Sequence, residues 1–429
     1  MSIDKLKLCN TFIYMSTVSH LDFSRVGNRI AISGFLGIEN FRVLTAAIYA
    51  TVHKEGYADV ILDFSNCTAA FPGAMLPICN ACLAEQESGV SFSLRLPNDP
   101  KLRKLFLDTN WAYLIDAVQT ETLYKGYLQV PATRFRNYEE QGRLVDRVID
   151  AVLKSVPGFS REDLAALEWC FSEITDNVLN HANSPTGGLV QLSNRSHVRR
   201  IEFAVCDFGD GIPRTLRPSH PEIYEDYEAL SWSIREGVTR DTEIGQGNGL
   251  FGSTELCSGS GGFINIQSGN ASLLKSSIGT RLRREKIPLQ GTFIDGCISY
   301  AQPGELAKAL KFPVSGSDFL SLRYELNDEM PRIIVRTEVE SVGARLAAAP
   351  IRIKVLNLLN IAKIDQIAVD FIGVPLISSS FADEALGKLA AILGLEVFQS
   401  KIQVLNANPT VIGLINRAIQ QRMALRLTL

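Results

Sequence analysis

Three polar residues, Glu173, Asn177 and His181, recur at four-residue intervals between Glu168 and Ala182. Residues four apart lie on one face of an α-helix, so a helix here would align a carboxylate, an amide and an imidazole. A carboxylate can take a proton from an attacking water or hydroxyl, and an amide oxygen is a hard ligand that suits Mg²⁺. Such a row is more often a solvated helix surface, so the face alone does not define a site.

The flanking sequence predicts that this segment is a helix with a buried side. Ser160 followed by Asp163 is typical of an N-cap with a capping box. The apolar residues expected to pack are Trp169, Phe171, Ile174 and Val178.

Two glycine-rich segments follow along the chain. The first contains Asp207, Gly209 and Gly211 and comes after an alternating apolar segment typical of a strand. The second reads G-Q-G-N-G-L-F-G over residues 245–252. Either alone is a common turn. Glycines ahead of a helix, here expected to begin near Leu250, leave backbone N–H groups free to cradle phosphates.

In this order the three segments resemble the N, G1 and G2 boxes of the GHKL ATPases, a family that includes histidine kinases and anti-sigma serine kinases. Gly291-Thr292, before the strand at 293–294, resembles the third glycine box. The resemblance implies ATP and Mg²⁺ as cofactors, and helices packed on one face of a mixed sheet. The chain contains no G-x-x-x-x-G-K-[ST], the motif of P-loop enzymes.

The resemblance also implies a role for each matching residue. Glu173 would be the catalytic base, and Asn177 would bind Mg²⁺. Asp207 would accept the adenine amino group, because a carboxylate is an acceptor only. The other residues implied in nucleotide binding are His181, Gly209, Gly211, Gly245, Gly247, Asn248, Gly249, Leu250 and Thr292. For His181, direct phosphate contact and a position behind another ligand both stay open.

Residues 214–244 would form a lid over the nucleotide, with a helix at 227–235. Lids of this kind order over bound ligand. Arg235, Arg240 and Asn248 are alternative contacts to the γ-phosphate.

The whole chain has the composition of a globular protein. Its 429 residues predict two to four domains. The net charge of −3 gives no overall basic field, so we expect neither nucleic acid nor an anionic membrane as partner. The short basic run 281–286 is expected on a solvated loop. No apolar run reaches the length of a membrane span, and the first residues lack a signal peptide.

The eight cysteines are scattered, which favours a reducing cytoplasm. Cys79 and Cys82 form one C-x-x-C without a second pair or flanking histidines. Two helix-packing thiols are favoured there over a zinc or redox site.

Strands alternate with helices from about residue 26 to residue 116, which predicts an α/β sheet. The expected strands are 29–33, 58–64 and 90–96, and the expected helices are 40–52, 73–87 and 101–108. The run Val60–Thr68 resembles the central strand and loop of STAS domains, the fold of the anti-anti-sigma factors. Their phosphorylatable serine would fall at Pro72, which has no hydroxyl.

A second STAS-like segment is expected near the carboxyl terminus. Asp370-Phe371 superposes on Asp63-Phe64 at an offset of 307 residues, and the following S-S-S-F-A-D-E motif resembles a STAS-like family of unknown function. Here the acceptor place is Ser379, and a helix cap is the alternative role for this serine cluster. Strands are expected at 320–326, 332–336 and 365–371, and helices at 342–359, 382–393 and 411–422.

Together these features predict three α/β domains: STAS-like over 1–128, a central GHKL α/β sandwich over 129–300 with a lead-in helix at 130–156, and STAS-like over 301–429. The expected function is an ATP-binding regulator that couples nucleotide state, and in one version serine phosphorylation, to unknown protein partners. The alternative is an ATP-gated homodimeric machine that phosphorylates no protein.

Overall fold

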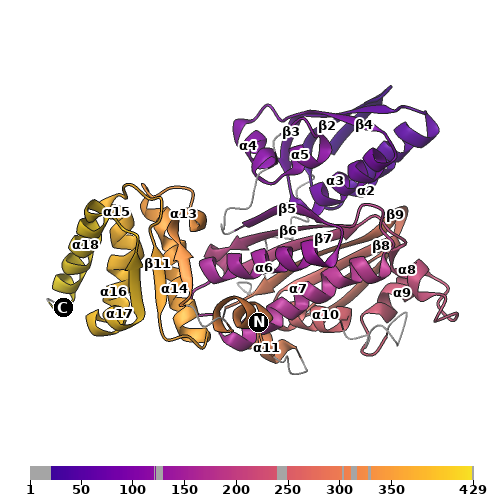
Figure 1. Cartoon of the computed structure of the whole chain (residues 1–429). Helices are drawn as coiled ribbons and strands as arrows, with labels where there is room; N and C mark the ends of the chain where they lie inside the picture. The colour runs from indigo at the N-terminus through magenta and orange to yellow at the C-terminus, as the bar shows by residue number, and fades with distance from the viewer. Residues whose placement is uncertain are drawn as a thin grey trace, which may run out of the picture. The chain divides into compact units, whose positions relative to one another are not determined.

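The computed structural model describes residues 21–119, 121, 129–238, 249–301, 304–310, 316–326 and 330–427 (Figure 1). The chain divides into two compact units, Met1–Thr120 and Glu121–Leu429. Both units combine helices with sheets, so the predicted α/β class is confirmed. The expected boundary near residue 300 falls inside the second unit, where one continuous apolar core spans both sides of it.

The first unit is a four-stranded sheet in the order β1-β2-β3-β4. Strand β1 pairs antiparallel with β2, and the other pairs are parallel. Ile30, Ile32, Val60 and Leu62 alternate with more exposed residues, because successive strand residues face opposite sides of a sheet. The strands are β1 (Leu21–Val26), β2 (Arg29–Leu36), β3 (Asp59–Ala70) and β4 (Ser91–Arg95).

The helices of this unit are α2 (Phe41–Tyr49), α3 (Pro72–Glu87), α4 (Pro100–Asp108) and α5 (Trp111–Ile115), with a π-helical turn at Ala50–Lys54. The predicted strands and helices are all present, and β1 and α5 are additional.

The second unit contains a five-stranded sheet in the order β5-β6-β7-β9-β8. Every pair in it is antiparallel, so the expectation of a mixed sheet is wrong. The strands are β5 (Gln129–Phe135), β6 (Gly188–Arg195), β7 (Arg200–Asp207), β8 (Phe263–Ser276) and β9 (Gly279–Ser299). The basic run 281–286, expected on a loop, lies in β9.

Three helices, α6 (Tyr138–Ser155), α7 (Arg161–His181) and α10 (Gly249–Gly259), pack on one face of this sheet (Figure 1). The lead-in helix expected at 130–156 begins only at Tyr138. Asn137 caps it by accepting a hydrogen bond from the Glu140 N–H at 2.9 Å, and the preceding residues pair in β5. Two shorter helices, α8 (Gly211–Leu216) and α9 (Asp226–Ser233), follow β7.

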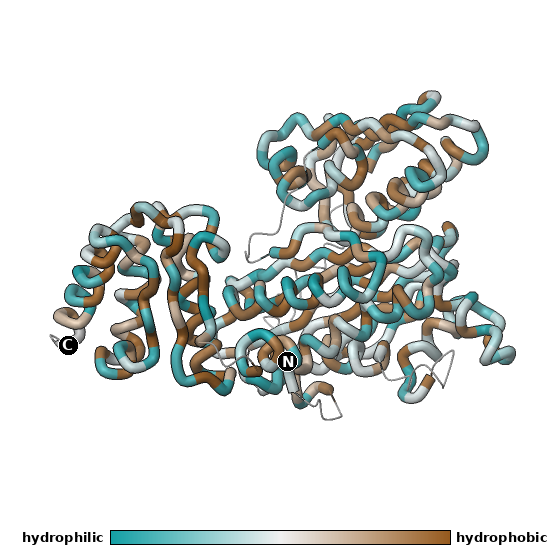
Figure 2. The backbone as a smooth tube through the Cα atoms, in the orientation of Figure 1, coloured by the Kyte–Doolittle hydropathy of each residue, from teal (hydrophilic) through white to brown (hydrophobic). Residues whose placement is uncertain are grey.

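The carboxyl-terminal part of this unit is a parallel sheet in the order β10-β11-β12. Its strands are β10 (Arg332–Ile334), β11 (Ile367–Asp370) and β12 (Ile402–Leu405). Its longer helices are α14 (Arg345–Ile361), α16 (Lys388–Leu393), α17 (Leu395–Lys401) and α18 (Pro409–Leu427), and its shorter ones are α11 (Glu305–Ala309), α12 (Asp318–Leu320), α13 (Val335–Glu338) and α15 (Ser379–Ala382). Hydrophobic residues lie along β11 and α14 (Figure 2).

Several expectations for this part are wrong. The strand expected at 320–326 is helical, because Ser317 caps α12 and a π-helical turn, Ser321–Glu325, continues it. Phe319, Leu320 and Tyr324 are buried on that helical segment. The strand expected at 332–336 ends at Ile334. The helix expected at 382–393 begins at Ser379 and includes a π-helical turn, Asp383–Gly387. Helix α17 and strand β12 were not predicted.

The parallel strands β2, β3 and β4 of the first unit have the same order and a similar register as β10, β11 and β12 of the second unit. Arg29 stands opposite Ile61, two residues before Asp63, and Arg332 stands opposite Ala368, two residues before Asp370. In each copy the arginine forms an ion pair with the buried aspartate. Each aspartate also accepts a hydrogen bond at 2.9 Å from the N–H two residues on. The helix after the strand begins nine residues past the aspartate in both copies.

A buried ion cluster joins α6 to the carboxyl-terminal part. Lys154 and Lys354 each contact both Asp150 and Glu338, at N–O distances between 2.5 and 2.9 Å. Burial alone would raise the pKa of Asp150, but the charges of the two lysines hold this pKa at about 2. Asn357 of α14 adds hydrogen bonds of 2.8 Å to the carbonyls of Leu153 and Val156.

We expect Lys354→Met to lower the free energy of unfolding by about 3 kcal/mol, because it leaves two buried carboxylates to one lysine. Urea unfolding monitored by circular dichroism measures the change. The matched control is Arg143→Met on α6, the helix that carries Asp150 and Lys154 of the cluster. The Arg143 side chain is 61 % exposed and pairs with Glu139 one turn away, so its loss should cost about 0.5 kcal/mol or less. Equal effects of the two substitutions would contradict this account of the cluster.

Candidate nucleotide-binding site

Helix α7 has the predicted span and the predicted N-cap. Ser160 Oγ accepts a hydrogen bond from the Asp163 N–H at 3.0 Å. The reciprocal half of the expected capping box is absent, because the Asp163 carboxylate instead accepts hydrogen bonds from the N–H groups of Gly304 and Ala307. Asp163 therefore ties the start of α7 to the segment that follows β9.

Glu173, Asn177 and His181 lie on successive turns of α7 and are all half-buried. Neither Glu173 nor Asn177 forms a side-chain hydrogen bond with any residue that the structure describes, so both remain available to a ligand. Burial, and next the charge of Asp176, raise the pKa of Glu173. A carboxyl with a raised pKa in a half-buried place has the character of a proton acceptor.

Glu173 lies against the first residue of α10. A Cβ on Gly249 would overlap Glu173 Oε2, so a larger residue at this position would displace the carboxylate. The helix begins where the second glycine box predicted it, and Leu250 is half-buried in its first turn. Gly245, Gly247 and Asn248, with Arg240 of the lid, lie outside the described residues.

Asp207 ends β7 and is 5 % exposed. Its Oδ1 accepts hydrogen bonds from the N–H groups of Gly209, at 2.9 Å, and Thr292, at 3.3 Å. Within the described part of the chain Oδ2 accepts none, which leaves an acceptor for a ligand. Burial raises the pKa of Asp207 to about 7. The structure thus brings together three of the predicted residues from the first and third glycine boxes.

A serine that the sequence analysis did not identify connects the segment after β7 to Gly291 of β9. Ser268 of β8, fully buried, donates to the Gly291 carbonyl at 2.7 Å and accepts from the Ile212 N–H at 3.0 Å. A Cβ on Gly211, where φ is +76°, would approach Ser268 Oγ to 2.5 Å. Ser268 lies 57 residues from Gly211 along the chain, so no local pattern reveals the contact.

The first glycine turn also contacts the end of α7. The Asp210 N–H donates to the Ala182 carbonyl at 2.7 Å, and a Cβ on Gly209 would overlap that carbonyl. The end of α7, the turn after β7, the start of α10 and residues 291–292 of β9, where its pairing with β8 is irregular, therefore converge. In the described part of the segment expected to form a lid, the helices are the end of α8 and the whole of α9. The Arg235 guanidinium lies 4.6 Å from the Trp232 ring centre.

The serine cluster after β11 caps a helix. Ser378 Oγ accepts a hydrogen bond from the Phe381 N–H at 3.0 Å, as the cap interpretation predicted. Ser379 follows as the first helical residue and is exposed. Its counterpart in the first unit, Pro72, opens α3. The motif's Asp383 binds Arg345 and Arg422 from the flanking helices α14 and α18.

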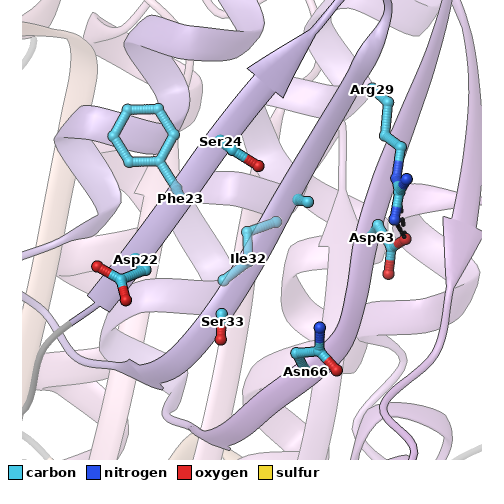
Figure 3. Close-up of a pocket in the computed structure, with 9 residues that line it drawn as sticks. Asp22, Phe23, Ser24, Arg29, Ile32, Ser33, Asp63 and Asn66 are labelled. Atoms are coloured by element: carbon cyan, nitrogen blue, oxygen red, sulfur yellow. Dashed lines mark hydrogen bonds and ion pairs between the residues drawn. The ribbon is translucent and has the colours of Figure 1, made fainter.

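The first unit has a shallow depression of about 170 Å³ on its sheet. Figure 3 shows Arg29 beside Asp63, with Ser24, Ser33 and Asn66 on the neighbouring strands. Arg29 and Arg95 both contact Asp63. Because the same arginine–aspartate pair recurs in β10 and β11, we assign it to strand registration.

The cysteines and the candidate metal ligands offer no second site. Cys79 and Cys82 are buried within α3, and burial raises the pKa of the Cys82 thiol. No group of three or more His, Cys, Asp or Glu residues able to hold a metal ion occurs in the described ranges. None of the helices in those ranges has the length and apolar character needed to cross a bilayer.

Comparison with known proteins assigns one segment. Residues 347–411 match a STAS-like domain of unknown function (DUF4325). The match runs from α14 through β11 and β12 to the start of α18, so the predicted carboxyl-terminal STAS-like domain is confirmed. No curated protein and no solved structure matches the chain.

The raised pKa of Asp207 predicts how stability depends on pH. The folded protein holds a proton on Asp207 that the unfolded chain releases near pH 4, so this residue's contribution to stability falls as pH rises from about 4 to 7. Asp207→Asn keeps the acceptor Oδ1 but removes the charge. We expect the variant to be more stable than the wild type at pH 8 by about 2–4 kcal/mol.

The gain should shrink towards pH 5, as measured by urea unfolding at both values. Asp365→Asn, at an exposed position before β11, is the control for removal of a surface charge. A pH-independent effect of Asp207→Asn would contradict the assignment of the buried proton.

Proposed function

We propose that the second unit binds ATP in the manner of the GHKL ATPases and couples nucleotide state to protein contacts made by STAS-like domains. The observation that carries the proposal is the convergence of four sequence boxes on one place. Asp207 Oδ2 faces no partner among the described residues and is the proposed acceptor for the adenine amino group. Glu173 is the proposed base, one helical turn from Asn177.

The donors present fit a nucleotide with a magnesium ion. The Asn177 amide makes no side-chain hydrogen bond within the described ranges, and Mg²⁺ takes few protein ligands beside phosphate oxygens and water. A bound ion would neutralise phosphate charge, and Asn177 would hold it. Glu173 would take the proton of the attacking water or hydroxyl, which its raised pKa favours.

Helix α7 supports the coupling. Its second half carries Glu173, Asn177 and His181. Its first half binds the segment that leads to the carboxyl-terminal domain: Glu168 accepts hydrogen bonds from Ser317 Oγ at 2.6 Å and the Phe319 N–H at 2.8 Å. Arg161 forms a two-pronged ion pair with Glu325.

A shift of α7 would therefore move both the proposed nucleotide-binding residues on its second half and the segment bound to its first half. These hydrogen bonds and this ion pair are partly buried and give α7 a direct physical connection to the carboxyl-terminal part.

The repeat supports a STAS-like first domain as well. The family match covers the second copy only, but β2, β3 and β4 repeat its strand order, register and arginine–aspartate pair. Linking such modules in one chain raises their effective concentration for each other.

Two variants test the site. Asp207→Asn should weaken ATP binding, because an amide presents a donor towards the adenine amino group. Glu173→Gln should keep ATP affinity and lower turnover by about 10²–10⁴-fold. Isothermal titration calorimetry and phosphate release measure the two effects. Glu162→Gln, at an exposed position on the first turn of α7, is the control for helix perturbation. Wild-type affinity in Asp207→Asn would remove the site assignment.

The kinase version and the ATP-gated alternative differ in where phosphate goes. Ser379 is exposed at the first turn of α15, so its hydroxyl is accessible as a phosphate acceptor. A helix N-terminus tolerates the negative charge that the phosphate adds. A kinase acting on its own chain should label Ser379 and leave residues 71–74 unmodified. A gated machine should release phosphate to solvent and change its mass in solution with ATP. Mass spectrometry beside light scattering separates them, with Ser379→Ala as control.

A further inference from the structure

Strands β8 and β9 extend beyond the rest of the sheet as a two-stranded hairpin. They pair with each other down to Ser276 and Gly279, whereas β7 pairs with β9 only between Phe293 and Ser299. Among the described residues, no third strand pairs with residues 270–290 (Figure 1). The hairpin is anchored at its base, because Ala271 and Leu273 are fully buried.

The tip of this hairpin is apolar and exposed. Ile278 lies in the two-residue turn and is 86 % exposed. Leu274 and Leu282 flank it at 37 % and 39 % exposure. Turns of this length favour Gly, Asn or Asp, so backbone geometry does not account for a β-branched apolar residue there.

The same hairpin is strongly basic. Residues 270–290 contain five Lys or Arg and one acidic residue, a net charge of +4 in a chain whose net charge is −3. Two of the cations are neutralised locally: Lys275 pairs with Glu255, and Arg284 lies 3.5 Å from Glu225. The remaining three are Arg281, Arg283 and Lys286.

These three cations form no ion pair with any residue of the described ranges, and all are exposed. Arg281 and Arg283 are two apart on a strand, so both side chains project from one face about 6–7 Å apart.

We propose that the tip of the β8–β9 hairpin docks the protein on an anionic lipid surface. Ile278 and Leu274 enter the interface, while Arg281 and Arg283, which project from the same face as Leu274, contact headgroup phosphates. This occupant accounts for both features of the hairpin. Nucleic acid would use the cations through its phosphates but would leave the apolar tip in water. An apolar groove on a protein would bury the tip but leave the three cations without partners.

The test is sedimentation of the full chain with vesicles. Vesicles of phosphatidylcholine and phosphatidylglycerol, mixed at about three to one, should bind the protein at about 0.1 M salt and release it at about 1 M, while phosphatidylcholine alone should not bind it. The double change Arg281→Gln/Arg283→Gln should weaken binding by about tenfold, and Ile278→Ser by about fivefold.

Matched controls leave the hairpin intact. Lys104→Gln/Arg143→Gln removes the same charge at two other exposed sites, and Leu346→Ser removes an apolar side chain that is 87 % exposed on α14. Both should bind like the wild type. Thermal unfolding of each variant verifies that it folds.

Three outcomes would overturn the proposal: no binding to the anionic vesicles, equal binding to neutral ones, or wild-type binding by the hairpin variants. A further one is binding to duplex DNA that Arg281→Gln/Arg283→Gln abolishes and Ile278→Ser leaves unchanged, since that result assigns the cations to nucleic acid. ATP affinity is measured in parallel, because the lipid contact does not depend on it.

Discussion

The second unit depends on one helix that must satisfy two different surfaces. Helix α7 buries Leu164, Leu167, Phe171, Ile174 and Val178 in the core beneath the five-stranded sheet. Its polar residues divide by position: the first half binds the chain segments after β9, and the second half presents Glu173, Asn177 and His181. The packing of the apolar side sets the position of the helix, and with it the positions of these polar residues. The place where Asp207, Gly209 and Thr292 meet is built against its end.

The sequence predicted best where local chemistry decides the structure. The span of α7 follows from Ser160 as N-cap and from apolar spacing. The strand ending at Asp207 and the helix starting at Gly249 follow from alternation and from glycine placement. The offset of 307 residues between the two STAS-like segments also held, because the helix after the strand begins nine residues past Asp63 and Asp370 alike. These features need no knowledge of distant contacts.

The failures have a common physical cause in contacts between distant residues. The segment at 320–326 has apolar residues that suit a strand, but Ser317 caps it as a helix and Phe319, Leu320 and Tyr324 pack in the core. Ser268 is an ordinary strand residue until Gly211 and Gly291 approach it. Asp163 has the sequence of a capping-box partner, yet the N–H groups of Gly304 and Ala307 compete for it successfully. Lys154 and Lys354 look like surface lysines, and their burial depends on four charges meeting from three helices.

The shared geometry of the two parallel sheets has a consequence for folding. Two segments of one chain with the same strand order, register and arginine–aspartate pair can each accept the other's strands during synthesis, which is the characteristic misassembly of repeat-containing chains. The copies differ where pairing is decided. Strand β1 covers one edge of the first sheet. The side chain that reaches the aspartate from the third parallel strand, or directly after it, is Arg95 in the first copy and Asn406 in the second. A strand inserted into the wrong sheet would bring the wrong partner to a buried carboxylate, so these small differences select the native pairing.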